Sequence, residues 1–176
     1  MKYNAKDLAL AGLFGALGIV IPMLFHLVGL GKTFLPMHLP ILMCGLLVSP
    51  IVALVCGMIT PLASGALTSM PPIFPIGVIM SIELGILAFS ASIFYKKLKI
   101  HYIPAIILAM ICARIAYAIA MLLISPFIQQ DQSLKVIALS ILASWPGIVV
   151  QLLAIPAIMA IITKKSTIEK TEEEYT

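Results

Sequence analysis

Two oppositely charged side chains stand out in a long apolar part of the sequence. Glu83 is the only acidic residue between Asp7 and Asp131, and Arg114 is the only arginine. Glu83 lies about eight residues, or ~12 Å of helix, below Pro75. Arg114 lies about ten residues, or ~15 Å, from the corresponding end of the next apolar segment. Because charges in an apolar medium must be paired, the matching depths predict a Glu83–Arg114 ion pair.

This pair admits two roles, which the sequence leaves open. It can tie two helices together, or it can contact a polar ligand from the floor of a pocket. A wider polar network is an alternative to a simple pair. Tyr117 lies three residues after Arg114 and so shares its helix face, and Gln151 lies well inside a later apolar segment.

Further polar and aromatic residues gather toward the same end of the expected helices. The candidates for substrate contact, besides Glu83, Arg114, Tyr117 and Gln151, are Phe34, His38, Met70, Phe74 and Trp145. His38 is equally suited to a structural hydrogen bond, and Trp145 to an anchor at a membrane interface. No nucleophile with a base, no metal-ligand spacing and no phosphate-binding loop occurs. We therefore expect no catalytic residues, no metal and no cofactor.

The composition indicates what positions these residues. Of 176 residues, 62% are hydrophobic and 10% charged, and the mean hydropathy is +1.16. A domain of this size cannot bury that much apolar surface in water, so lipid is its solvent. We expect an all-α membrane protein with one bundle of six transmembrane helices over residues 1–163 and a charged cytoplasmic tail over residues 164–176. The net charge of +4 does not indicate nucleic acid, because the lysines lie at helix ends.

The expected helices cover residues 4–25, 35–48, 51–67, 75–94, 102–124 and 134–163, with a polar loop over residues 125–133. The second and third are short for full spans, so we expect them to tilt. Eight lysines fall on the side of the two termini and two on the other side. This bias predicts that both termini are cytoplasmic.

Two further local patterns lie in the proline-rich segment and in the first helix. Pro71 and Pro72 cannot continue a helix, so we expect a stiff outer turn, either a lid over a ligand or a plain connector. In the first helix, small residues recur four apart in the strip Ala11, Gly12, Gly15 and Ala16. Such a strip lets another helix approach closely, either a partner protein or a neighbour in the same bundle.

In order, the strip, "FLPMHLPILMCGLLVSP", "ITPLASGALTSMPPIFPIGVIMSIELG" and "ARIAY" resemble the substrate-binding S-component of energy-coupling factor (ECF) transporters. The likeness covers roughly residues 8–160, and "LPMHLP", "TSMPP" and "ELG" are its specific part. It implies high-affinity capture of a water-soluble vitamin or related micronutrient at an outward-facing pocket of a multi-pass cell-membrane protein that is not an enzyme.

The resemblance also implies partners. Delivery inward requires docking to a transmembrane coupling subunit that carries two ATPases, and the S-component topples in the membrane to release its cargo. By position, Ala11, Gly12, Gly15 and Ala16 match the docking strip, with glycines replacing some of the usual alanines. The loops around Phe34 and His38, and around Met70 to Phe74, match the lids over the pocket.

Substrate identity stays open at this point. A core arginine suits a carboxylate, so pantothenate is the first candidate, but neutralisation by Glu83 removes that preference. Riboflavin, folate and pyridoxine-like, lipoate-like or queuosine-like compounds remain. The alternatives to an S-component are a stand-alone secondary transporter, a membrane scaffold and an intramembrane enzyme. The two halves show no internal repeat of the kind secondary transporters usually carry.

Overall fold

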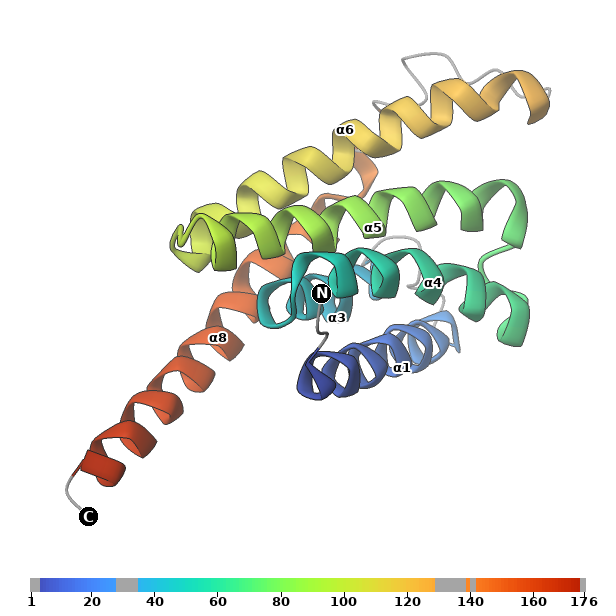
Figure 1. The fold of residues 1–176 in the computed structure, drawn as a ribbon. Helices are drawn as coiled ribbons and strands as arrows, with labels where there is room; N and C mark the ends of the chain where they lie inside the picture. The colour runs from blue at the N-terminus through green and yellow to red at the C-terminus, as the bar shows by residue number, and fades with distance from the viewer. Residues whose placement is uncertain (1–3, 28–34, 129–138, 140–141, 175–176) are drawn as a thin grey trace.

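The computed structural model of the chain describes residues 4–27, 35–128, 139 and 142–174. The elements in chain order are α1 (Ala5–Leu27), α3 (His38–Leu47), α4 (Pro50–Thr68), the π-helical turn η1 (Ile73–Gly77), α5 (Val78–Ser92), the π-helical turn η2 (Ile93–Lys97), α6 (Tyr102–Ile128) and α8 (Trp145–Glu174). Within these described residues the fold is all-helical, as expected (Figure 1).

Five segments are long and apolar enough to cross a membrane. They are Ala5–Phe25, Pro50–Thr68, Ile73–Lys97, Tyr102–Phe127 and Trp145–Ile162. The helix His38–Leu47 is apolar but has only 10 residues, about 15 Å. It therefore reaches only about halfway through a bilayer core of ~30 Å.

The helix α5 occupies the centre of the bundle, in contact with α3, α4 and α6. Figure 1 shows α4, α5 and α6 running side by side, with α1 at one edge and α8 crossing to project beyond the other helices at its C-terminal end. Glycines allow the closest approaches. A Cβ on Gly45 would lie 2.6 Å from the Ala88 carbonyl oxygen, and one on Gly57 would overlap the Leu84 backbone. The central helices thus touch backbone to backbone.

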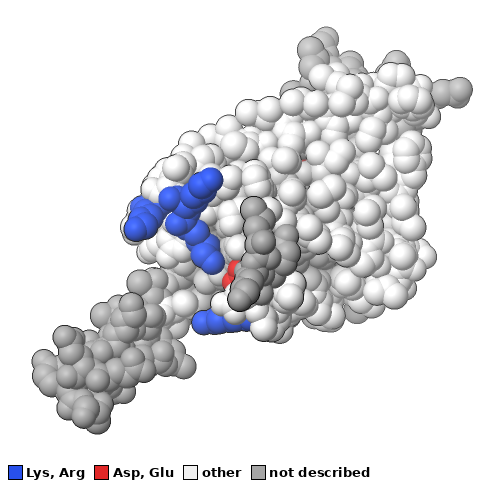
Figure 2. Space-filling model, viewed as in Figure 1, with Lys and Arg blue, Asp and Glu red and all other residues white. Residues whose placement is uncertain are grey.

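One end of the bundle is tied together around the α3–α4 connection. The Ser49 N–H donates to the Asp7 carboxylate at 2.9 Å, the Ser92 hydroxyl donates to the Val48 carbonyl at 2.7 Å, and the Lys96 ammonium donates to the Leu47 carbonyl at 3.0 Å. We call this the lysine end, for Lys6, Lys96, Lys97 and Lys99, which are all exposed. Figure 2 shows the basic side chains of the visible face gathered there beside a small acidic patch.

At the opposite end, the expected proline turn is present. The helix α4 ends at Thr68, Ser69 adopts a left-handed conformation with φ 58°, and the backbone is still extended at Phe74 (φ −120°, ψ 136°) within η1, before α5 starts at Val78. The Ser64 and Thr68 hydroxyls both donate to the Met70 carbonyl, at 2.8 and 3.0 Å. These bonds satisfy a carbonyl that the interrupted helix leaves free.

Two expected boundaries were wrong. Residues 125–128, expected in a loop, continue α6 through Pro126. The reason is that a proline removes only one donor, and the Ser125 hydroxyl donates to the Leu122 carbonyl at 3.0 Å, which keeps this turn bonded in an apolar setting. The last helix is interrupted by a turn at Ser144, and its backbone stays helical beyond residue 163, the expected end of the helix, to Glu174.

The backbone contact at Gly57 leads to a stability prediction. We expect Gly57→Ala to lower the free energy of unfolding by about 1–3 kcal/mol, because the added methyl group overlaps the α5 backbone. The matched control is Gly12→Ala, where an added Cβ meets nothing within 4 Å. Denaturant unfolding in detergent micelles measures both. Equal stability of Gly57→Ala and the wild type would contradict the close packing of α4 on α5.

Candidate functional site

The predicted ion pair is confirmed. The Arg114 Nη1 of α6 donates to the Glu83 Oε1 of α5 at 2.9 Å. Glu83 is 2% exposed, and the Arg114 side chain is 18% exposed. Glu83 lies on the buried face of α5 with Leu84 and Leu87, so the pair faces the bundle interior and not the lipid.

His38 completes a cluster that the sequence did not predict. Its Nε2 lies 3.3 Å from the same Glu83 Oε1. The register follows from the bond between Ser92 and Val48 at the lysine end. Counting back from that bond, Glu83 is nine residues up α5 and His38 is ten residues up α3, so the two side chains share a level, ~14–15 Å from the lysine end. The short length of the apolar segment before Ser49-Pro50 was the signal that would have revealed this.

We call Glu83, Arg114 and His38 the buried charge cluster. With a neutral imidazole its charges sum to zero, since the carboxylate and the guanidinium cancel. Both His38 ring nitrogens are buried; the Nε2 faces the Glu83 oxygen, and the Nδ1 has no partner. Arg114 lies 12 residues from the start of α6, about 18 Å, so the cluster sits near mid-depth of the membrane. The carboxylate and the guanidinium of this cluster therefore stabilise each other, while the His38 Nδ1 stays available for a hydrogen bond.

Two further predicted residues lie in the interior or near it. Tyr117 is half-buried one turn after Arg114. Gln151 is 1% exposed on α8, and its amide oxygen and nitrogen make no hydrogen bond. Gln151 therefore does not join a hydrogen-bonded network with the ion pair, and that form of the prediction was wrong. The reason is that Gln151 lies on α8, whose main contacts are with α6 and α3, whereas Glu83 lies on α5.

The remaining predicted contact residues are not brought to the cluster. Met70, Phe74 and Trp145 are 52%, 58% and 64% exposed near the end opposite the lysines. Phe34 lies outside the described residues. Among the residues that the structure describes, no three His, Cys, Asp or Glu side chains group as a metal site.

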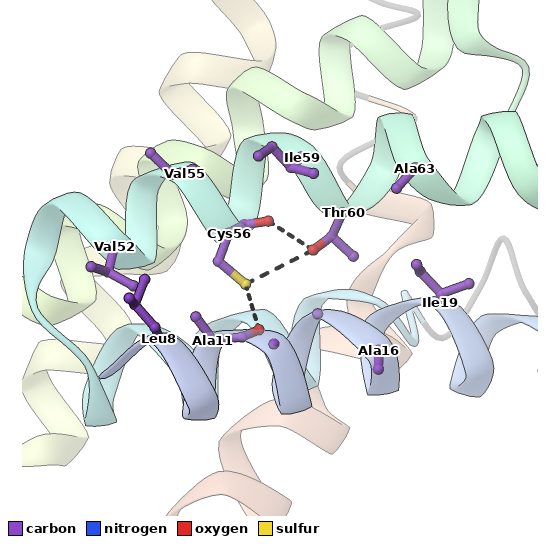
Figure 3. A pocket seen from close by; sticks show the side chains of 12 residues that line it. Leu8, Ala11, Ala16, Ile19, Val52, Val55, Cys56, Ile59, Thr60 and Ala63 are labelled. Atoms are coloured by element: carbon purple, nitrogen blue, oxygen red, sulfur yellow. Dashed lines mark hydrogen bonds between the residues drawn. The ribbon is translucent and has the colours of Figure 1, made fainter. Parts of the chain in front are cut away.

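A separate apolar groove of about 450 Å³ lies between α1 and α4 (Figure 3). It is lined by Leu8, Ala11, Gly12, Gly15, Ala16, Ile19, Val52, Val55, Cys56, Ile59, Thr60 and Ala63, which include the whole predicted docking strip. The Cys56 thiol donates to the Ala11 carbonyl at 3.3 Å and fastens the two helices along the groove floor.

The strip divides between two faces of α1. Ala11 and Gly15 are half-buried toward α4, and a Cβ on Gly15 would lie 3.5 Å from the Thr60 hydroxyl. Gly12 and Ala16 are exposed, with open space around Gly12. One half of the strip therefore packs inside the bundle, and the other half is open.

The ion pair leads to a second prediction. We expect Arg114→Met and Glu83→Met each to lower the free energy of unfolding by about 3–5 kcal/mol, because each leaves a buried charge without its partner. The double variant Glu83→Met/Arg114→Met is expected to lose less unfolding free energy than the two single variants lose together, because neither charge remains in it. A double-mutant cycle by unfolding in detergent tests this, and additive losses would contradict the pairing.

Comparison with known proteins identifies the chain's relatives. A family model described as "ECF transporter, substrate-specific component" matches residues 6–164. No curated protein and no solved structure matched the chain. The family match covers nearly all of the bundle and agrees with its apolar helices. The chain therefore belongs to the family of substrate-specific components of ECF transporters, multi-pass cell-membrane proteins that take up vitamins and related micronutrients and are not enzymes.

Proposed function

We propose that this chain captures one water-soluble vitamin or related micronutrient from the outside and delivers it inward through an ECF coupling subunit with two ATPases. The observation that carries the proposal is the buried charge cluster at mid-depth, in a chain of the substrate-specific family. Ionisable residues inside a membrane protein are expensive to place, and they commonly mark a substrate path.

The orientation of the bundle is part of the proposal. The bias of lysines toward one end supports a cytoplasmic location of the lysine end and of both termini. The turn at Met70 and Pro71 and the start of α8 then face outside, above the cluster. With α3 as a sixth, partial crossing, Met70, Phe74 and Trp145 are candidates for the outer rim of the pocket. Phe34, outside the described residues, stays a candidate from the sequence. Tyr117 is a candidate for its wall, beside Glu83 and Arg114.

The coupling subunit is proposed to dock on the open half of the α1 strip. Ala5, Ala9, Gly12 and Ala16 are exposed and follow one another at intervals of three or four residues, so they form one smooth stripe along α1. The adjoining groove offers an apolar cleft into which a partner helix can pack. The interior half of the strip, Ala11 and Gly15, packs against α4 and so holds α1 in place behind this stripe.

Pantothenate remains the first candidate for the substrate, because it carries a carboxylate together with an amide and hydroxyl groups. The Glu83–Arg114 pair weakens the argument from the carboxylate alone, since the guanidinium is already neutralised. The uptake experiment below therefore offers a mixture of vitamins and not pantothenate alone.

The transport proposal is tested by reconstitution into vesicles. We expect uptake of a vitamin mixture from yeast extract only when the chain, the coupling subunit, its two ATPases and internal ATP are all present. The isolated chain is expected to bind but not to transport. Uptake by the chain alone would contradict the proposal and favour a stand-alone secondary transporter.

The docking proposal has its own variant. We expect Gly12→Leu to abolish co-purification with the coupling subunit, because a bulky side chain prevents close approach of helices, while substrate binding is retained. Ala157→Leu on the exposed face of α8 adds the same side chain away from α1 and serves as the control. Intact complex formation by Gly12→Leu would place the coupling interface elsewhere.

A further inference from the structure

Two side chains in the described core have buried polar atoms without a partner. They are His38, whose Nδ1 has none while its Nε2 faces the Glu83 oxygen at 3.3 Å, and Gln151, whose amide oxygen and nitrogen both have none. The two residues are 3% and 1% exposed. A buried polar group without a partner costs about 1–3 kcal/mol, so unpartnered groups are rare in native cores and call for a specific cause.

Both side chains face the same core from the half of the bundle away from the lysines. On α8, Gln151 lies one turn before Ile155 and two turns before Met159, which belong to the buried core cluster. On α3, His38 lies one turn before Leu42 of the same cluster. The helices α3 and α8 contact each other. Both groups therefore face the core to which the contacting helices α3 and α8 contribute.

The chemistry of this region is polar but uncharged. The Arg114 guanidinium is bound to Glu83 at 2.9 Å, so its positive charge is already neutralised by a carboxylate of the protein. What remains is the His38 Nδ1, which accepts a hydrogen bond when the Nε2 proton points to Glu83, and a carboxamide, with two donors and one acceptor. A carboxylate only accepts, and so it would leave the acceptor atoms of His38 and Gln151 unsatisfied. A group that both donates and accepts would satisfy both kinds of atom.

Building on the proposed function, we infer that the substrate buries an uncharged amide-type group, such as an amide, lactam, imide or urea, against His38 and Gln151. A carboxylate on the same substrate then points away from Arg114. His38 and Gln151 would set specificity, because a site built to hydrogen-bond a substrate group rejects analogues that lack it by up to about 10⁴–10⁵-fold.

The test uses the full chain purified from yeast-extract medium, with the vitamin mixture of that medium as the probe. Native mass spectrometry identifies and quantifies the retained compound. We expect a compound with an amide-type group in the wild type, and about tenfold or greater loss of occupancy in Gln151→Met. The ligand-free Gln151→Met protein should unfold at the same or a higher temperature, because a side chain of similar volume replaces an unsatisfied amide.

The matched control is Ile155→Met, one turn along the same buried face, which should retain the compound. If Gln151→Met does not fold, His38→Met and His38→Gln apply the same test, with loss expected for the first and retention for the second. Equal occupancy in Gln151→Met would overturn the inference, as would a retained compound whose only polar groups are carboxylates or phosphates. Failure of the wild type to take up any compound with its coupling subunit would instead contradict the proposed function.

Discussion

The ion pair between Glu83 and Arg114 is the constraint around which the bundle is organised. In a membrane neither charge is stable alone, so α5 and α6 must turn these residues toward each other and hold them at one depth. That requirement sets the rotation of two long helices at once. It also leaves the third member of the cluster, His38, against a carboxylate whose charge is already neutralised. The charges of the polar centre thus neutralise each other, while the His38 Nδ1 still lacks a hydrogen-bond partner.

The helices are tightly packed around this centre and loosely packed at the edge of the bundle, and the two regions suit different roles. At Gly45 and Gly57 the backbones of α3, α4 and α5 approach so closely that a methyl group would not fit. At the edge, α1 lies against α4 across an open groove, with the Cys56–Ala11 bond on its floor. The helix α4 serves both sides, since Cys56 faces α1 and Gly57 faces α5. A tightly packed interior suits a substrate site, and an open edge suits a surface that another protein contacts.

Much of the architecture could be predicted from the sequence, and the errors have identifiable causes. The ion pair was predicted because depth along a helix is a count of residues at a constant rise. The His38 contact was not predicted because the position of a residue along its helix does not say which neighbouring helix its side chain faces. The continuation of α6 through Pro126 was missed because a proline-containing loop signal was given more weight than the apolar setting, in which backbone groups need helical partners. The division of the α1 strip was left undecided, because small residues alone do not say which neighbour approaches them.

The sequence by itself determined the solvent, the all-helical architecture and the matching depths of Glu83 and Arg114, since these follow from composition and from position along the chain. Only the tertiary structure decided which faces meet. It placed His38 on Glu83, turned Gln151 into a core without a partner, and divided the strip so that Gly15 faces α4 and Gly12 lies open. The physical reason is that depth is a property of one helix, whereas its rotation is set by contacts with several others, which lie far away in the sequence.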